Sequence, residues 1–531
     1  MPERPATDRP ARGRRPGPRS QQRPAERARV ADPARRAAYT VLRAVAEGAY
    51  ANLELPAVLR AARLGGRDAA FATELSYGTL RLRGRYDPII EVAAGRASSA
   101  IDANVLDTLR LGCHQLLGMR VPAHAAVAET VALARQVNGA GAAGFVNAVL
   151  RRVSERTVDD WLEAVAPSSG PDPLARLAVR ESHPVWILKA LREALLGHGR
   201  STRESVEADL AGLLAADNAP AALSLVARPG LSDLAELAAG GAVEGRWAAT
   251  AATLPGGDPG GLAAVREGRA AVQDEGSQLV ALALAAVPVD GTGSTNGEAS
   301  EIENAQAGRA RPQRWLDLCA GPGGKAGLLA ALARQQGAAF VANEVSEHRA
   351  ELVRHTLRPA LAAGGSGGSG SGGRGSGGRG AVEVRVGDGR EVGELEPAAY
   401  DKVLVDAPCT GLGALRRRPE ARWRRTPEDL VALTKLQREL LASALDATRP
   451  GGVVAYVTCS PHLAETVFTV RDIVKKRPDV EVLDARNWLR DKHGQPIPGS
   501  GSGPFAQLWP DVHGTDGMFL ALLRRGSREH P

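Results

Sequence analysis

The amino-acid sequence predicts a multidomain protein in which an all-α domain is followed by a small α+β module and a C-terminal α/β domain of the Rossmann-like type. The 531 residues exceed what a single hydrophobic core usually serves. Apolar residues recur at helical spacing in the first third of the chain. Further along, short β-branched runs alternate with helical stretches, which is typical of a parallel sheet covered by helices.

Composition narrows the class of protein. Lys and Arg number 67 against 60 Asp and Glu, a net charge of +7 that favours an acidic partner such as nucleic acid. No apolar run reaches the roughly 18 residues of a membrane span, so we expect a cytoplasmic protein without a membrane partner. The four cysteines lack CxxC spacing, which argues against a disulfide framework and a zinc site, and we expect no metal.

The N-terminal part divides into a tail and a helical domain. Residues 1–33 are rich in Arg and Pro and poor in apolar residues, which predicts a disordered basic tail that either aids solubility or binds RNA weakly through phosphates. Residues 34–165 carry apolar side chains at helical spacing, for example Leu53, Val58 and Leu59. We therefore expect amphipathic helices there.

The middle of the chain mixes both periodicities. Residues 186–195 and 206–215 have helical patterns, and residues 222–226 form a short strand-like run between Gly/Pro turns. These features predict a small α+β linker module over residues 172–270.

The C-terminal part, residues 271–526, has the pattern of a Rossmann-like domain. Its first helix is predicted over residues 271–286, entered through an Asp or Ser cap. Residues 287–312 are rich in Gly, Ser, Asn and Glu, residues 363–380 are almost pure Gly and Ser, and we expect both to be flexible insertions.

A glycine-rich turn lies between the first strand of this domain, residues 315–319, and a helix over residues 326–335. Glycines let the backbone approach a ligand closely, and a helix N-terminus offers free N–H donors. Glu344 ends the next strand about twenty residues after the glycines, where a carboxylate can bind ribose hydroxyls, and Asp388 ends the third. The pattern predicts a nucleoside cofactor, although such turns also close helix–strand corners with nothing bound.

Two later strands, residues 401–406 and 453–458, each lead to a cysteine. Carboxyl ends of neighbouring parallel strands share one crevice, so Cys409 and Cys459 should lie near each other and near Asp406. A thiolate adds to C6 of cytosine and makes C5 nucleophilic, which suits a pyrimidine methylation. The alternative for each thiol is a small buried hydrophobic side chain.

Three motifs, residues 317–325, 406–411 and 458–460, resemble those of the RNA cytosine-5 methyltransferases in order and spacing. Residues 67–79 and 145–152 resemble the helical RNA-binding domain named after the antitermination factor NusB. The combination is similar to the Sun/Fmu family of small-subunit ribosomal RNA methyltransferases. It implies an all-α NusB-like domain in front of a Rossmann-like methyltransferase domain.

The resemblance implies a function. Members methylate C5 of a cytosine in small-subunit (16S) rRNA with S-adenosyl-L-methionine, through a covalent adduct at C6. It makes Cys459 the nucleophile and Cys409 the residue for product release. Asp406 could share a proton with the ring N3 or the exocyclic amine. Lys325 matches the motif lysine, in a chain where only seven of the 67 basic residues are lysines.

The resemblance also implies a set of residues that contact the cofactor: Cys319, Ala320, Gly321, Pro322, Gly323, Gly324, Lys325, Glu344, Asp388 and Asp406. Two positions depart from the family pattern. Glu344 replaces the aspartate that is more usual at the ribose position, and Glu465-Thr466 stands where Glu-Asn is common. Either carboxylate can bind a ribose diol, so the first departure leaves the cofactor prediction intact.

An arginine-rich segment follows the Cys409 turn, and we interpret it as an RNA backbone surface with one stacking group: Arg416, Arg417, Arg418, Arg422, Trp423, Arg424 and Arg425. The alternative is a solvated charged face. Because C6 is reached only on an unstacked base, the target cytosine should lie in a loop or be flipped out.

Two other functions stay open from the sequence. A tRNA cytosine-5 methyltransferase would use the same chemistry, and a non-catalytic RNA-binding ribosome assembly factor could keep the same fold. The helical front domain favours small-subunit rRNA as the partner, and we expect a monomer. The sequence does not indicate which cytosine is modified.

Overall fold

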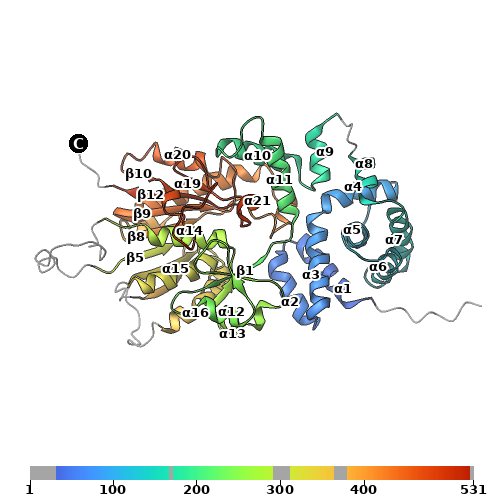
Figure 1. Cartoon of the computed structure of the whole chain (residues 1–531), viewed down its shortest axis with the longest axis horizontal. Coiled ribbons are helices and arrows are strands. Elements are labelled where there is room, and N and C mark those ends of the chain that lie inside the picture. The colour runs from blue at the N-terminus through green and yellow to red at the C-terminus, as the bar shows by residue number, and fades with distance from the viewer. Residues whose placement is uncertain (1–30, 167–170, 291–310, 364–379, 527–531) are drawn as a thin grey trace, which may run out of the picture.

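The computed structural model describes residues 31–166, 171–290, 311–363 and 380–526, and it shows a helical body on one side and a sheet-containing body on the other (Figure 1). Nearly all of the predicted basic tail and most of both predicted insertions lie outside these residues. Within the described ranges, no helix has both the length and the apolar composition needed to cross a bilayer.

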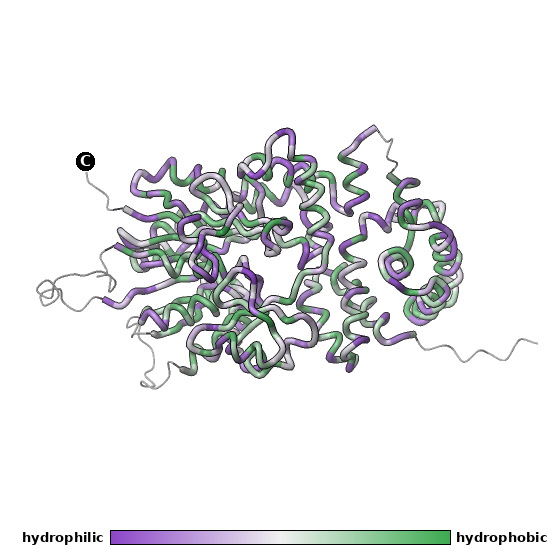
Figure 2. The backbone as a smooth tube through the Cα atoms, in the orientation of Figure 1, coloured by the Kyte–Doolittle hydropathy of each residue, from purple (hydrophilic) through white to green (hydrophobic). Residues whose placement is uncertain are grey.

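The front domain is all-α, as predicted. Its helices are α1 (Pro33–Ala46), α2 (Ala51–Ala61), α3 (Gly66–Arg81), α4 (Arg83–Ala94), α5 (Ala103–Leu117), α6 (Ala123–Val137), α7 (Ala140–Val153) and α8 (Val158–Val165). Hydrophilic and hydrophobic stretches alternate along them in Figure 2, as amphipathic helices require. One predicted apolar position differs: Leu53 is 56% exposed, whereas Leu55 on the same helix is buried at 4%.

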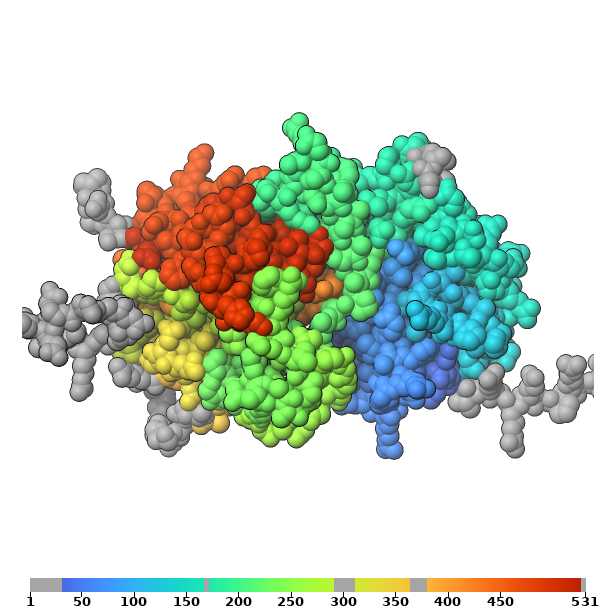
Figure 3. Space-filling model, viewed as in Figure 1, coloured from blue at the N-terminus to red at the C-terminus, as the bar shows by residue number. Residues whose placement is uncertain are grey.

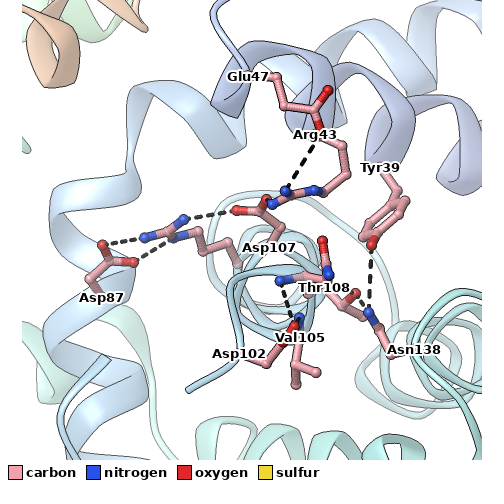
Figure 4. Close-up of polar contacts among 11 residues, drawn as sticks. Tyr39, Arg43, Glu47, Asp87, Asp102, Val105, Asp107, Thr108 and Asn138 are labelled. Atoms are coloured by element: carbon pink, nitrogen blue, oxygen red, sulfur yellow. Dashed lines mark hydrogen bonds and ion pairs between the residues drawn. The ribbon is translucent and has the colours of Figure 1, made fainter. Parts of the chain in front are cut away.

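A chain of ion pairs ties the helices of this domain together (Figure 4). Asp107 on α5 accepts from Arg43 on α1 at 2.8 Å and from Arg110 at 2.8 Å. Arg110 in turn holds both oxygens of Asp87 on α4, at 2.6 and 2.7 Å. Because both carboxylates are engaged by arginines inside the domain, these charges serve its packing.

The linker module contains both helices and strands. The helices are α9 (Pro173–Arg180), α10 (Val185–Gly197), α11 (Val206–Asn218), α12 (Leu234–Ala239) and α13 (Ala263–Arg266). The strands are β1 (Leu223–Ala227), β2 (Val243–Glu244), β3 (Ala251–Leu254) and β4 (Ala270–Val272), in a 4-stranded antiparallel sheet of order β2-β3-β1-β4. Residues 270–272 are therefore strand, and the helix predicted from residue 271 begins only at Glu275, capped by Asp274.

The C-terminal domain is built on an 8-stranded sheet of order β10-β12-β9-β8-β5-β6-β7, with β11 paired to β12. The strands are β5 (Arg314–Asp317), β6 (Ala339–Glu344), β7 (Val382–Val386), β8 (Tyr400–Asp406), β9 (Thr448–Thr458), β10 (Val480–Leu483), β11 (Ala506–Gln507) and β12 (Phe519–Arg525). Strands β5 to β9 run parallel, and β12 pairs antiparallel with both β9 and β10. The predicted Rossmann-like architecture is confirmed.

Helices cover both faces of this sheet. One face packs on α14 (Glu275–Ala286), α15 (Gly324–Gln335) and α16 (Glu347–Ala363), and the other on α17 (Val392–Leu395), α19 (Asp429–Ala447) and α20 (Val467–Val474). Alternate residues of β9 enter the two cores: Val453 and Val457 on one face, Val454 and Tyr456 on the other. With both faces buried, the sheet presents its strand ends as the accessible edge.

The strand order reverses at β5, because the chain builds β6 and β7 on one side of it and β8 and β9 on the other. In open α/β sheets such a reversal opens a crevice at the carboxyl ends of the strands. The glycine turn after β5 and the two cysteines after β8 and β9 all lie at this edge.

The linker module also contacts the segment that follows the Cys409 turn. Leu412, Leu415 and Trp509 of the C-terminal domain pack in one buried cluster with α10 and α11. Figure 3 shows the blue front domain and the green linker module in direct contact. This packing places the arginine-rich segment at the boundary of the three parts.

Candidate active site

The two cysteines predicted to share a crevice lie side by side. Strands β8 and β9 pair in parallel with Asp406 opposite Val457, so the turns that follow the two strands begin side by side at the same edge of the sheet. The Sγ atoms of Cys409 and Cys459 are 3.5 Å apart. Both side chains are partly accessible at the sheet edge, and a single substrate ring could therefore meet both sulfurs.

The surroundings distinguish the two thiols. The hydrogen bond from Cys409 favours the thiolate of Cys459 and lowers its pKa, against the effect of burial; the positive charges of Arg418 and Lys325 act in the same direction as the hydrogen bond. The same contact, together with burial, raises the pKa of Cys409 well above its ordinary value. Cys459 is thus the better nucleophile, since the thiolate is the reactive form.

Lys325 and Asp406 form an ion pair next to the thiols. The Lys325 Nζ atom donates to Asp406 Oδ2 at 2.8 Å, across the crevice between α15 and the end of β8. Burial is the largest single effect and disfavours the ammonium form of Lys325, but the charge and hydrogen bond of Asp406, together with the charges of Cys459 and Asp317, outweigh it and raise the pKa of the lysine. The site therefore holds a fixed positive charge beside a carboxylate.

The glycine turn between β5 and α15 requires its glycines at two positions. A Cβ atom on Gly321 would lie 2.3 Å from Glu344 Oε2, and Gly323 has a φ of +113° with Thr356 Cβ only 2.8 Å from where its own Cβ would be. The amide of Gly321 donates to Glu344 Oε2 at 3.0 Å. The backbone of the turn therefore lies directly against the Glu344 carboxylate. A side chain at position 321 would prevent this close approach.

The other two strand-end carboxylates have protein partners. Glu344 is 2% exposed and pairs with Arg349 at 3.3 Å. Asp388 pairs with Arg390 at 2.6 Å, and both line a cavity of about 620 Å³ between α17 and α19. Of the residues predicted to contact the cofactor, only Asp388 lines that cavity.

Asp317, at the end of β5, is a site residue that the sequence did not single out. It is 1% exposed, no side chain donates to its carboxylate oxygens, and the backbone amide of Cys319 lies close to them. Burial, and then the charge of Asp406, raises its pKa to about 8. A buried carboxyl group without a side-chain partner beside the glycine turn can donate or accept a hydrogen bond, so the turn fits a polar ligand such as a nucleoside.

The arginine-rich segment is largely turned toward the protein. Arg422 is completely buried, so the predicted RNA contact of this residue is wrong. Its guanidinium donates to the carbonyl oxygens of Arg81, Ser182 and Asp217 and to the Asn218 side chain, at 2.7 to 3.2 Å. The sequence does not reveal this burial, because the partners of Arg422 belong to the front domain and the linker module, far away in the chain.

The neighbours of Arg422 divide between protein contacts and solvent. Arg416 donates to the Gly514 carbonyl, Arg417 pairs with Asp516, Trp423 donates to the Leu80 carbonyl, and Arg424 donates to the Val45 carbonyl. Arg418 is exposed and Arg425 is partly exposed. RNA contacts by these six residues stay predictions.

Metal chemistry has no donor set among the residues that the structure describes. They contain no group of three or more His, Cys, Asp or Glu side chains arranged to hold a metal ion. The crevice brings together a thiolate-favouring cysteine, a cysteine held as the thiol, a lysine and carboxylates.

Comparison with known proteins agrees with this architecture. A family model described as 16S rRNA methyltransferase RsmB/F matches residues 309–362 and 377–524, and a NusB family model matches residues 32–155. A protein of Mycobacterium tuberculosis that is named as a methyltransferase is 50% identical over 502 residues, covering 94% of this chain and 98% of that protein.

A more distant relative carries a more specific name. The ribosomal RNA small subunit methyltransferase B of Pseudomonas putida is 31% identical over 507 residues, covering 92% of this chain and 98% of the relative. The crystal structure of PH0851 superimposes with a TM-score of 0.70 at 19% identity, covering 93% of this chain and 98% of that chain. That similarity concerns the fold.

Proposed function

Because this chain belongs to the RsmB/F family of 16S rRNA methyltransferases, we propose that it methylates C5 of a cytosine in small-subunit rRNA through a covalent bond between Cys459 and C6. The observation that carries this proposal is the 3.5 Å separation of the two sulfurs beside the Lys325–Asp406 pair. Adjacent thiols of unlike pKa suit a reaction with one addition and one elimination.

In the addition step, the Cys459 thiolate bonds to C6 and the electron pair of the C5–C6 double bond moves toward the ring N3. Asp406 would share a proton with N3 or with the exocyclic amine, and the hydrogen bond from Lys325 at 2.8 Å would hold that carboxylate in place. Charge that develops on the ring is thereby stabilised by fixed groups of the protein.

In the release step, a proton leaves C5 and the Cys459–C6 bond breaks, which restores the aromatic ring and the thiolate. Cys409 would lie next to such a ring, since its sulfur is 3.5 Å from the nucleophile. Its raised pKa means that it begins as a thiol, so it would first give up its own proton to solvent and then, as the thiolate, take the proton from C5.

The methyl donor that fits this site is S-adenosyl-L-methionine, which would supply the methyl group when bound. The turn residues 319–325, together with Glu344, Asp388 and Asp406, would hold it. The Glu344 carboxylate already accepts from the Gly321 and Ser346 amides and pairs with Arg349, so a ribose hydroxyl would donate to a remaining acceptor position or displace one of these partners.

The larger organisation follows from the same proposal. Residues 34–165 would dock the rRNA, residues 172–270 would join the two working parts, and residues 271–526 would carry out the methylation. We further propose that the protein acts as a monomer in the cytoplasm, where the rRNA is assembled.

The test is a trap for the covalent intermediate. Cys409→Ala should accumulate an SDS-resistant adduct with undermodified 16S rRNA and labelled methyl donor, and the Cys409→Ala/Cys459→Ala double variant should not. Cys459→Ala alone should abolish turnover with little change in thermal midpoint, because the thiol lies at the accessible edge. Cys113→Ala, in the core of the front domain, is the control for a lost thiol.

Absence of the adduct from Cys409→Ala would refute the assigned roles. Adduct formation with tRNA but not with 16S rRNA would make tRNA the substrate in place of rRNA. Binding of rRNA without any methyl incorporation by the unmodified protein would point to an assembly factor.

A further inference from the structure

Glu465 is a fully buried carboxylate that the mechanism above does not use. It follows the Cys459 turn, its side chain is 0% exposed, and it has no ion-pair partner among the salt bridges of the described residues. Its Oε1 atom accepts from the Thr410 amide at 2.8 Å and from Gln437 Nε2 at 3.1 Å, and its Oε2 atom accepts from the Thr410 hydroxyl. Neutral donors alone therefore hold this buried group.

These contacts reach both sides of Cys409. Gln437 Nε2 also donates to the Pro408 carbonyl at 2.8 Å, and Thr410 is the residue after Cys409. The Tyr456 hydroxyl fixes the Glu465 backbone by donating to its carbonyl at 2.7 Å. The turn that carries Cys409 is thus tied on each flank to one carboxylate.

The network also has a direction. The Thr410 hydroxyl donates its single proton to Glu465 Oε2. The contact of 3.1 Å between the Thr410 and Ser460 hydroxyls then requires Ser460 to be the donor. If an amide replaces the carboxylate, its NH₂ group faces N–H or O–H groups that are themselves donors. At least one of these hydrogen bonds must then reverse or break.

Cys459 depends less on Glu465 than Cys409 does. Its strand is paired on both sides, with Thr458 opposite Phe519 of β12, and its own carbonyl accepts from the Gly413 amide at 2.9 Å. In the Cys409 turn, Pro408 and Thr410 depend on Glu465 and Gln437. Loss of the carboxylate should therefore displace the Cys409 sulfur more than the Cys459 sulfur.

We propose that Glu465 is a positioning residue for the release step: it holds the Cys409 turn at its distance from Cys459, so that Cys409 can take the C5 proton. The inference rests on the proposed function and deepens it. It predicts that a change at Glu465 slows release while addition and methyl transfer continue.

The experiment compares Glu465→Gln and Thr410→Val with the unmodified protein on 16S rRNA. We expect multiple turnover to fall by about 10- to 100-fold, as for a lost hydrogen bond to a charged group, and the SDS-resistant adduct to accumulate. Methyl incorporation in a single turnover should stay within about threefold, the change expected when a hydrogen bond of this kind is not used in that step.

Two further variants separate positioning from general damage. Thr410→Ser restores the hydroxyl donor and should recover most of the release rate lost in Thr410→Val. Glu275→Gln removes another buried carboxylate, which accepts from the Arg246 and Trp247 amides at 2.8 Å in the linker region. It should not accumulate adduct, even if it lowers stability.

Equal losses in single-turnover transfer and in multiple turnover, or no adduct from either Glu465→Gln or Thr410→Val, would overturn the inference. If Glu465→Gln does not fold, Thr410→Val decides alone, because valine nearly matches the shape of threonine. Failure of the proposed function is seen separately: Cys409→Ala would then give no adduct at all.

Discussion

Arg422 offers a quantitative test of how the three parts are held together. It is 0% exposed, and its guanidinium makes hydrogen bonds to acceptors in the front domain and the linker module. Arg422→Met keeps much of the aliphatic stem and removes every donor. The expected result is that the front domain separates from the catalytic domain more readily, while each domain keeps its fold.

The magnitude follows from the contacts. Each hydrogen bond to a charged group contributes about 1.5–3 kcal/mol. The substitution also removes the cost of burying a guanidinium, which is several kcal/mol and is reflected in a pKa lowered to about 9 by burial. Leaving the acceptors buried and unpaired should therefore cost about 3–5 kcal/mol, as in other broken buried pairs. The docked state would lose on the order of 10²- to 10⁴-fold in population.

Hydrogen exchange read by mass spectrometry is the assay. Peptides that cover the contact points, around Ala51, Gly84 and Ser182, should exchange faster in Arg422→Met, because the Gly84 amide donates to the Ser182 hydroxyl and the Ala51 amide to Glu420 across this boundary. Peptides from the central strands should be unchanged.

The matched control is Arg525→Met. Arg525 also donates to a group of backbone carbonyls, those of Leu445, Asp446 and Thr448, but all lie inside the catalytic domain. It should destabilise that domain without faster exchange at the boundary. Equal exchange in Arg422→Met and the unmodified protein would refute the reasoning, and so would uniform exchange over the whole chain.

Two further predictions concern titration at the site. Burial raises the pKa of Asp317 to about 8, so the folded protein keeps a proton that the unfolded chain releases, and the free energy of unfolding should fall as pH rises from about 4 to 8. Between pH 5 and 8, Asp317→Asn should lose about 2–4 kcal/mol less of this free energy than the unmodified protein. Thermal midpoints that change in parallel with pH in the two proteins would contradict this. Iodoacetamide should alkylate Cys459 at a lower pH than a free cysteine and leave Cys409 unmodified, because the pKa values shift in opposite directions. Arg418→Gln should move the Cys459 profile upward, and mass spectrometry that finds both thiols equally reactive would disprove the distinction.

The sequence was sufficient for features that depend on short stretches. Apolar, β-branched runs predicted β8 and β9 as buried parallel strands, and the rule that ligands bind at strand ends predicted that Cys409, Cys459 and Asp406 lie together. The structure places the two sulfurs 3.5 Å apart, as that reasoning required. The all-α and Rossmann-like fold classes were predictable for the same reason.

Features that depend on distant partners could not be predicted. In the sequence, Arg422 looks like its exposed neighbour Arg418. Arg422 is buried because its guanidinium donates to carbonyl groups of helices that are remote in the chain. Asp317 is buried because its strand is flanked on both sides, by β6 and by β8, which are distant in the sequence. Leu53 was assigned to the wrong face because Pro56 and the short helix leave the helical period poorly defined.

The pairing of β9 with β12 has a consequence for biosynthesis. The strand that leads to Cys459 is completed by residues 519–525, which leave the ribosome about sixty residues later. The front-domain helices make mostly local contacts and can fold while translation continues. A nascent chain stalled before residue 519 would therefore carry a folded helical domain and an unpaired edge of β9. Such an edge can pair with another chain and aggregate, or be bound by a chaperone.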